Sequence, residues 1–144
     1  MSRSTGLWRL SIVCSVLLCA SFTGHAQGFV IANPSVTYTQ LSVNQLRAIF
    51  GMRMRTWPDG HVLVVAVLPD SSSAHITFCK QILNVFPYQL RRAWDRLVFS
   101  GTGQAPLTVS DQAAMLETIA RTPGAIGYIS GTVDDARIKI LQID

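Results

Sequence analysis

Apolar residues fall into short runs that are separated by turn-forming residues. Val62–Leu68 contains no polar residue, which predicts a strand that is covered on both faces and lies near the centre of a sheet. Apolar runs at Phe29–Ala32 and Ala125–Ile129, and an alternating run at Arg137–Ile143, predict three further strands. Between these strands, apolar residues spaced three or four apart predict helices.

The first helix has a clear start signal. Ser42 and Gln45 stand three residues apart just before the apolar positions Leu46 and Ile49, which is the pattern of a capping box. We expect this helix to end at Gly51, because glycine often follows the last helical turn.

Three more helices follow the Val62–Leu68 strand. The second carries one apolar stripe, the third begins near Pro87, and the fourth runs from about Ser110 to Arg121. The stripe of the second helix consists of Ile76, Cys79, Leu83 and Phe86. The resulting order of strands and helices predicts an α/β sandwich with short connections.

The first 26 residues have the features of an export signal. Arg3 and Arg9 form a basic start, Leu10–Phe22 is apolar, and Gly24 and Ala26 are the small residues that a signal peptidase requires. The apolar run is shorter than the roughly 20 residues of a membrane-spanning helix. We therefore expect cleavage after Ala26, a periplasmic location and no membrane span in the mature protein.

Cysteine positions leave a second processing route open. Cys14 or Cys19 would be the acylated residue of a lipoprotein, but Val13 and Leu18 precede them where a small residue is required. After cleavage, Cys79 is the one remaining thiol, so the mature chain has no internal disulfide. Its neighbours favour a buried position, and a reactive or pairing thiol is the alternative.

Cleavage leaves residues 27–144, which is enough for one domain and too few for two. Ten of the 12 basic residues remain against eight acidic residues, because two of the arginines belong to the signal. Such a small positive balance does not indicate a nucleic-acid partner.

The candidate site lies where the Val62–Leu68 strand meets the next helix. Asp70, Ser71, Ser72 and Ser73 combine three hydroxyls with the free backbone N–H groups of a helix start, a combination that suits an oxyanion. Serine and aspartate are also the preferred helix caps, so capping alone is the competing interpretation. Five arginines could pair with the same anion: Arg53, Arg55, Arg91, Arg92 and Arg96.

Catalytic and metal patterns are weak. Ser100–Gly103 is rich in glycine but lacks the Gly-Lys-Ser/Thr of a nucleotide-binding loop, so we expect a plain surface loop. His61 and His75 have no second histidine or cysteine at a metal-ligand spacing. No motif of a nucleophile or of paired carboxylates is present. We therefore expect a binding protein that is not an enzyme and needs no metal or cofactor.

Taken together, the motifs resemble the phosphate-binding protein family of bacterial ABC importers. The resemblance covers roughly Phe29 to Ile143 and rests on the segments Leu41–Gly51, Trp57–Gly60, Asp70–Ser72, Phe78, Trp94, Phe99–Gly101 and Pro123–Tyr128. It implies one lobe of a type 2 periplasmic-binding-protein fold, with a small mixed sheet flanked by helices. Full members have two lobes that close on phosphate.

The resemblance also implies site residues. In the family, an Asp and a Ser-Gly-Thr-like segment at a helix start hold the anion, and here Asp70 and Ser72 match those positions. Ser73 and Ala74 stand where the glycine and threonine would be, and Leu68 replaces a common arginine. These departures weaken the expected grip on the ligand.

Two functions follow as expectations. The first is weak binding of phosphate or a similar oxyanion, linked to ABC-type uptake, with a homodimer completing the site. The second is an envelope protein-interaction module that has lost its small ligand. Its partner would bind an apolar face around Trp57 or Tyr128. We expect the Tyr128 hydroxyl to lie at the edge of the lobe, and Gly127 to permit close approach of a neighbouring backbone.

Overall fold

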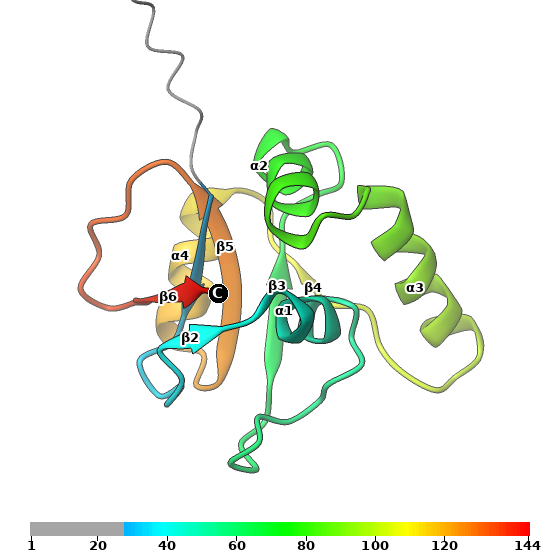
Figure 1. Ribbon diagram of the computed structural model, residues 1–144, viewed down its shortest axis with the longest axis horizontal. Coiled ribbons are helices and arrows are strands. Elements are labelled where there is room, and N and C mark those ends of the chain that lie inside the picture. Colours follow the sequence, from blue (N-terminus) through cyan, green and yellow to red (C-terminus); the bar gives the residue numbers. More distant parts are fainter. Residues whose placement is uncertain (1–27) are drawn as a thin grey trace, which may run out of the picture.

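The computed structural model describes residues 28–144 (Figure 1). The predicted signal peptide, residues 1–26, lies outside the described residues, as do Cys14 and Cys19. Within residues 28–144, no helix is both long and apolar enough to cross a membrane. The strands and helices follow the predicted order, with two additional strands of two residues each.

The described strands form one mixed sheet. They are β1 (Gly28–Ala32), β2 (Gln40–Leu41), β3 (Val64–Val67), β4 (Leu107–Thr108), β5 (Ala125–Ser130) and β6 (Lys139–Ile143). The strand order is β2-β6-β1-β5-β3-β4, with β1 antiparallel to β5 and β6, and with β3 parallel to β5 and β4. β3 lies next to the edge strand β4, which is only two residues long, so β3 does not hold the expected central position.

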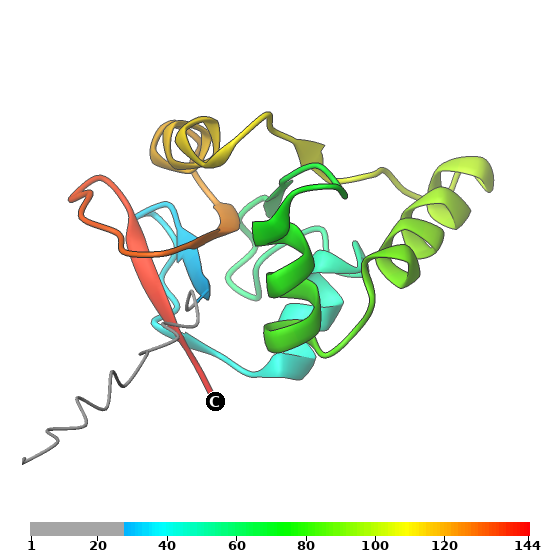
Figure 2. The same ribbon diagram turned by 90° about the horizontal axis from the view of Figure 1, so that it is seen from above.

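Helices cover both faces of this sheet. They are α1 (Val43–Phe50), α2 (Ser73–Thr77), the π-helical segment η1 (Phe78–Leu83), α3 (Pro87–Phe99) and α4 (Gln112–Arg121). In Figure 2, α4 lies on one side of the sheet, and α1, α2 and η1 lie on the other. The α/β class with a small mixed sheet flanked by helices is thus confirmed.

The predicted start of α1 is confirmed in atomic detail. The backbone N–H of Gln45 donates to Ser42 Oγ at 3.2 Å, and the backbone N–H of Ser42 donates to Gln45 Oε1 at 2.8 Å. These bonds satisfy donors that the first helical turn leaves free. The helix ends at Gly51, and it buries Leu46 and Ile49 against the sheet.

The predicted stripe of the second helix is partly wrong. Cys79 and Leu83 are buried, but Ile76 is only half-buried and Phe86 is 52% exposed. The chain passes from α2 into the wider π-helix, whose bonds join residues five apart and shift the register of the buried face. The segment then ends at Asn84, which adopts a left-handed conformation with φ 53° and turns the chain before Phe86.

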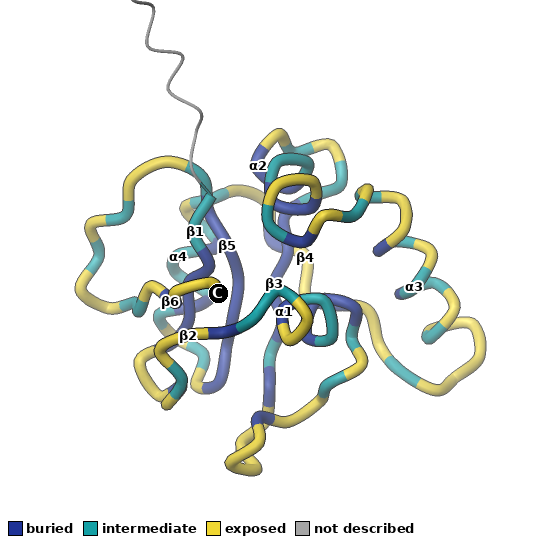
Figure 3. Tube along the Cα trace, in the orientation of Figure 1, coloured by how far each residue is buried: buried dark blue, intermediate teal, exposed yellow. Residues whose placement is uncertain are grey.

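Of two expectations about β5, the one about Tyr128 is wrong and the one about Gly127 needs correction. The Tyr128 side chain is completely buried instead of lying at the lobe's edge, and its ring stacks on Phe78 with centroids 3.8 Å apart. A Cβ on Gly127 would lie 2.5 Å from Met115 Sδ and 3.2 Å from Ile119 Cδ1. Gly127 is therefore required mainly by the side chains of α4, while the neighbouring backbone oxygen of Ala66 would lie at an ordinary contact distance of 3.5 Å. Figure 3 shows buried β5 along the middle of the domain.

Candidate functional site

The four predicted ligand residues form one turn between β3 and α2. The backbone N–H of Ser72 donates to the Pro69 carbonyl at 2.9 Å, which closes the turn. Ser71 and Ser73 are exposed, while Ser72 and Asp70 are partly exposed. No hydrogen bond from the three seryl hydroxyls is formed within the described part of the chain. Ser72 occupies the N-cap position of α2, as the capping interpretation requires, but its side chain makes no capping hydrogen bond to the helix.

Arg91 on α3 binds the carboxylate of Asp70 through two parallel hydrogen bonds. Its Nε donates to Asp70 Oδ2 and one terminal nitrogen donates to Oδ1, both at 2.9 Å. Such a fork is the strongest geometry that arginine and carboxylate can adopt. The bonds from Arg91 hold the pKa of Asp70 below its ordinary value, so this carboxylate is ionised at neutral pH. The guanidinium also lies over the ring of Trp94, 4.9 Å from its centroid.

Behind the turn, His75 and Tyr128 are completely buried. The backbone N–H of Leu68 donates to the Tyr128 hydroxyl at 2.9 Å, and that hydroxyl lies within hydrogen-bond distance of His75 Nδ1. Because the tyrosyl oxygen accepts from Leu68, its own proton is directed to His75 Nδ1. We therefore assign the neutral histidine tautomer that carries its proton on Nε2.

The Nε2 side of His75 faces two further groups. Asp70 Oδ1 lies at 3.8 Å and Cys79 Sγ at 3.5 Å. Burial lowers the pKa of His75, although the charge of Asp70 acts in the opposite direction. Burial raises the pKa of Cys79 to about 12, and it also raises the pKa of Tyr128. The group is thus neutral apart from the Asp70–Arg91 pair at the surface.

Sequence reasoning missed the link from Tyr128 to the site. It named Arg91 among five arginines but had no means of choosing it. One signal was available in the sequence. His75 stands four residues before Cys79, so it lies on the same side of the helix as the predicted apolar stripe. The partners of that histidine come from distant segments, and only the folded chain brings them together.

The other named arginines lie elsewhere. Arg55 donates to the Thr102 carbonyl of the Ser100–Gly103 loop, where the Ser100 and Thr102 hydroxyls are 2.7 Å apart. Arg92 lies over the exposed ring of Tyr88. Arg53 and Arg96 line a pocket between α1 and α3. Within residues 28–144, no three histidine, cysteine, aspartate or glutamate side chains are arranged so that they could hold a metal ion.

The sheet and helices define the class of fold, which is that of one lobe of the phosphate receptors of ABC importers. No protein family matches the chain by sequence, and no curated protein matches it either. Solved structures do match, and they bear out the expected resemblance at the level of fold.

Three of these structures show how far the likeness extends. A phosphate transport receptor from Vibrio cholerae has a TM-score of 0.62 and 17% identity, covering 81% of this chain and 45% of that one. PstS from Borrelia burgdorferi has a TM-score of 0.61 and 17% identity, covering 81% and 47%. A structure from Clostridium perfringens, described as a phosphate ABC transporter substrate-binding protein with bound phosphate, has a TM-score of 0.64 and 16% identity, covering 81% and 44%.

The chain therefore spans about half the length of the receptors that it matches. At this level of identity the likeness shows a shared fold and says nothing directly about ligand.

Proposed function

We propose that residues 27–144 form a periplasmic solute-binding domain that binds phosphate or a similar oxyanion weakly, in connection with ABC-type uptake. The binding residues are Asp70, Ser71, Ser72 and Ser73. The observation that carries this proposal is the turn itself, where three seryl hydroxyls that make no hydrogen bond within residues 28–144 stand beside the Asp70–Arg91 pair. The fold shared with phosphate receptors supports it.

The charges at the turn favour a particular kind of anion. Seryl hydroxyls donate to anionic oxygens, whereas the ionised Asp70 can only accept a hydrogen bond. Hydrogen phosphate still carries a proton that it can donate to Asp70, but sulfate at neutral pH carries none. We therefore expect phosphate to bind more tightly than sulfate.

The same geometry limits the affinity. An exposed helix start contributes only about 0.3–1 kcal/mol to anion binding, and even millimolar affinity requires about 4 kcal/mol. A ligand pocket normally encloses most of its ligand, whereas this turn lies on the surface of one lobe. Tight binding would therefore require a second surface, which a second copy of the chain could supply.

Amide chemical shifts of ¹⁵N-labelled residues 27–144 test the proposal. Phosphate at constant ionic strength is expected to shift the amides of Ser71, Ser72 and Ser73 with millimolar affinity, and sulfate to shift them less. Ser72→Ala is expected to weaken the response. Ser110→Ala is the matched control, because Ser110 is an exposed serine just before α4. Equal responses to phosphate, sulfate and chloride would contradict the proposal.

Two other measurements address location and assembly. The N-terminus of the protein recovered from the periplasm is expected to be Gln27, as cleavage after Ala26 requires. Sedimentation velocity with and without phosphate tests the homodimer. A dimer that forms only with phosphate supports completion of the site by a second copy, and an unchanged monomer limits the protein to weak binding.

The alternative function, a protein-interaction module, requires a different surface from the one that the sequence suggested. Trp57 is 2% exposed and Tyr128 is fully buried, so an apolar face around them is wrong. Trp57 is buried because its Nε1–H donates to the Gly124 carbonyl at 3.0 Å and its ring stacks on Tyr38. Four of the eight exposed large apolar side chains of the described residues lie on or beside α3, and Phe99 is the most exposed at 88%.

A further inference from the structure

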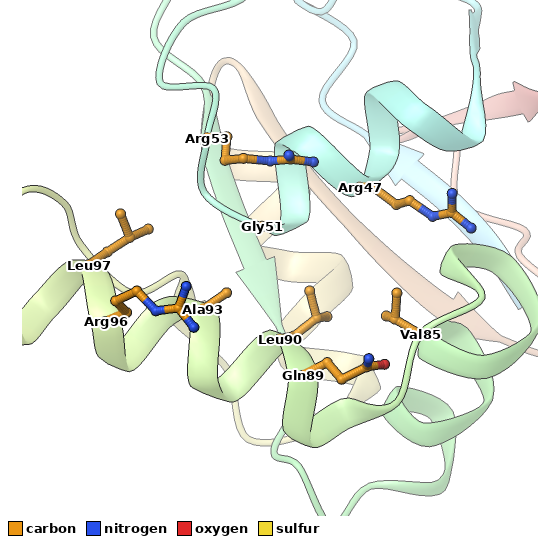
Figure 4. A pocket seen from close by; sticks show the side chains of 9 residues that line it. All are labelled: Arg47, Gly51, Arg53, Val85, Gln89, Leu90, Ala93, Arg96 and Leu97. Atoms are coloured by element: carbon orange, nitrogen blue, oxygen red, sulfur yellow. The ribbon is translucent and has the colours of Figure 1, made fainter.

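A pocket lies between α1 and α3, away from the Asp70–Ser73 turn (Figure 4). Its volume is 380 Å³, which falls in the range of about 300–1,000 Å³ that is typical of small-molecule sites. The lining is mainly apolar. Its apolar side chains are Val85, Leu90, Ala93 and Leu97, and most of them lie on one face of α3.

Three arginines stand around this apolar surface. Figure 4 shows Arg47 on α1, Arg53 just after α1, and Arg96 on α3 across the pocket. Arg47 is partly engaged, since its Nε donates to the Leu83 carbonyl at 2.7 Å. Within residues 28–144, Arg53 and Arg96 form no side-chain hydrogen bond or ion pair, and none of the three arginines pairs with a carboxylate. Positive charge at the pocket is therefore not neutralised by the described part of the protein.

We infer that this pocket binds a small organic anion with an apolar body, such as a single-chain carboxylate. The apolar lining would hold the body, because burying apolar surface is favourable. The guanidinium groups of Arg53 and Arg96 would hold the charged head, since arginine pairs with carboxylates in two-point geometry.

Neither inorganic phosphate nor a neutral lipid fits both features. Phosphate would leave the apolar lining in contact with water, and a neutral amphiphile would leave the arginines without a counter-charge. The pocket shares no lining residue with the Asp70–Ser73 turn, so the inference stands independently of the oxyanion site.

The probe for the test is decanoate, used below its micelle-forming concentration at pH 7.5. Binding to ¹⁵N-labelled residues 27–144 is expected to shift the amides of Gly51 and Ala93, which line the pocket. Matched probes separate head from tail. Acetate has the anion alone, decyl maltoside has a ten-carbon tail with a neutral head, and decyltrimethylammonium has a ten-carbon tail with a cationic head. Decanoate is expected to bind at least about tenfold more tightly than each of them.

Variants locate the binding in the pocket. Arg53→Gln combined with Arg96→Gln is expected to weaken decanoate binding at least about threefold. Ala93→Leu, which fills the pocket while keeping a good helix former on α3, is also expected to weaken it. Arg92→Gln is the control, because Arg92 is on the same helix but does not line the pocket.

Several results would overturn the inference. They are binding of decyl maltoside as tight as that of decanoate, shifts confined to residues outside the pocket, and a double arginine variant that binds as the unmodified protein does. Binding to phosphatidylglycerol vesicles without any response to decanoate would also overturn it, because it would show that a membrane surface attracts the arginines.

Discussion

The Tyr128 hydroxyl holds the end of β3 to the helix that follows it, and Tyr128→Phe removes this one oxygen. The hydroxyl accepts the backbone N–H of Leu68 at 2.9 Å and faces His75 Nδ1. Phenylalanine keeps the ring that stacks on Phe78, so the apolar packing is retained. The substitution therefore tests the two hydrogen bonds with little change in volume.

The expected loss follows from the two groups that are left without a partner. Both the Leu68 N–H and His75 Nδ1 are buried, and a buried polar group without a partner costs about 1–3 kcal/mol. Water could recover part of this loss, but the freed space is smaller than one water molecule needs. We expect the free energy of unfolding to fall by at least about 2 kcal/mol, a large share of the roughly 5–15 kcal/mol of a typical domain.

Urea unfolding of residues 27–144, followed by tryptophan fluorescence, measures this loss. The matched control is Tyr38→Phe. Tyr38 stacks on Trp57, and its hydroxyl makes no hydrogen bond within the described residues. This control is expected to cost less than about 0.5 kcal/mol.

A loss for Tyr128→Phe that equals the Tyr38→Phe control would refute the reasoning, because it would mean that the Leu68–Tyr128–His75 chain contributes nothing to stability. A second check is a cycle with His75→Leu. The two substitutions share a partner, so their combined cost should be less than the sum of the single costs.

Three further predictions follow from the same core. Burial lowers the pKa of His75, so below about pH 6.5 the unfolded chain takes up a proton that the folded chain does not. The free energy of unfolding should therefore decrease as the pH is lowered, by up to about 1.4 kcal/mol per pH unit. Urea midpoints at several pH values should show a weaker pH dependence in His75→Gln and an unchanged one in His61→Gln. Gly124→Ala should lower the free energy of unfolding by about 2 kcal/mol or more, as measured by calorimetry, because φ is +74° and the added Cβ would lie 2.1 Å from the Val62 carbonyl oxygen. Gly60→Ala is the control and should cost less, because no atom beyond its chain neighbours lies within 4 Å of its added Cβ. Cys79, whose pKa is raised to about 12, should react with a thiol reagent only after unfolding in urea, and rapid reaction of the native protein would contradict its burial.

Local signals account for much of the fold. The Ser42–Gln45 box, the start of α3 at Pro87 and the apolar run of β3 depend on residues within one or two turns of each other. Each of them was therefore visible in the sequence. The contiguous turn Asp70–Ser73 was visible for the same reason, since its residues lie together in any fold that places a helix after β3.

The misjudged positions depend on distant partners. The inner face of the second helix differs from the predicted stripe because Phe78–Leu83 is π-helical, and a simple 3.6-residue period does not describe such a segment. Tyr128 has the composition of an edge residue, with an apolar ring and a polar tip. Its hydroxyl is buried because Leu68 and His75, 60 and 53 residues away, supply hydrogen-bond partners.

The amino-acid order by itself determined the α/β class, the order of strands and helices, and the chemical types gathered at the β3–α2 turn. Tertiary structure alone decided which of five arginines reaches Asp70 and which two face an apolar pocket. The physical reason is that side-chain spacing along a helix or strand is set locally, whereas pairing across 21 or more residues depends on how the sheet and helices pack. Arg91 binds Asp70, and Arg53 and Arg96 line the same pocket, only because α3 lies beside both α1 and the start of α2.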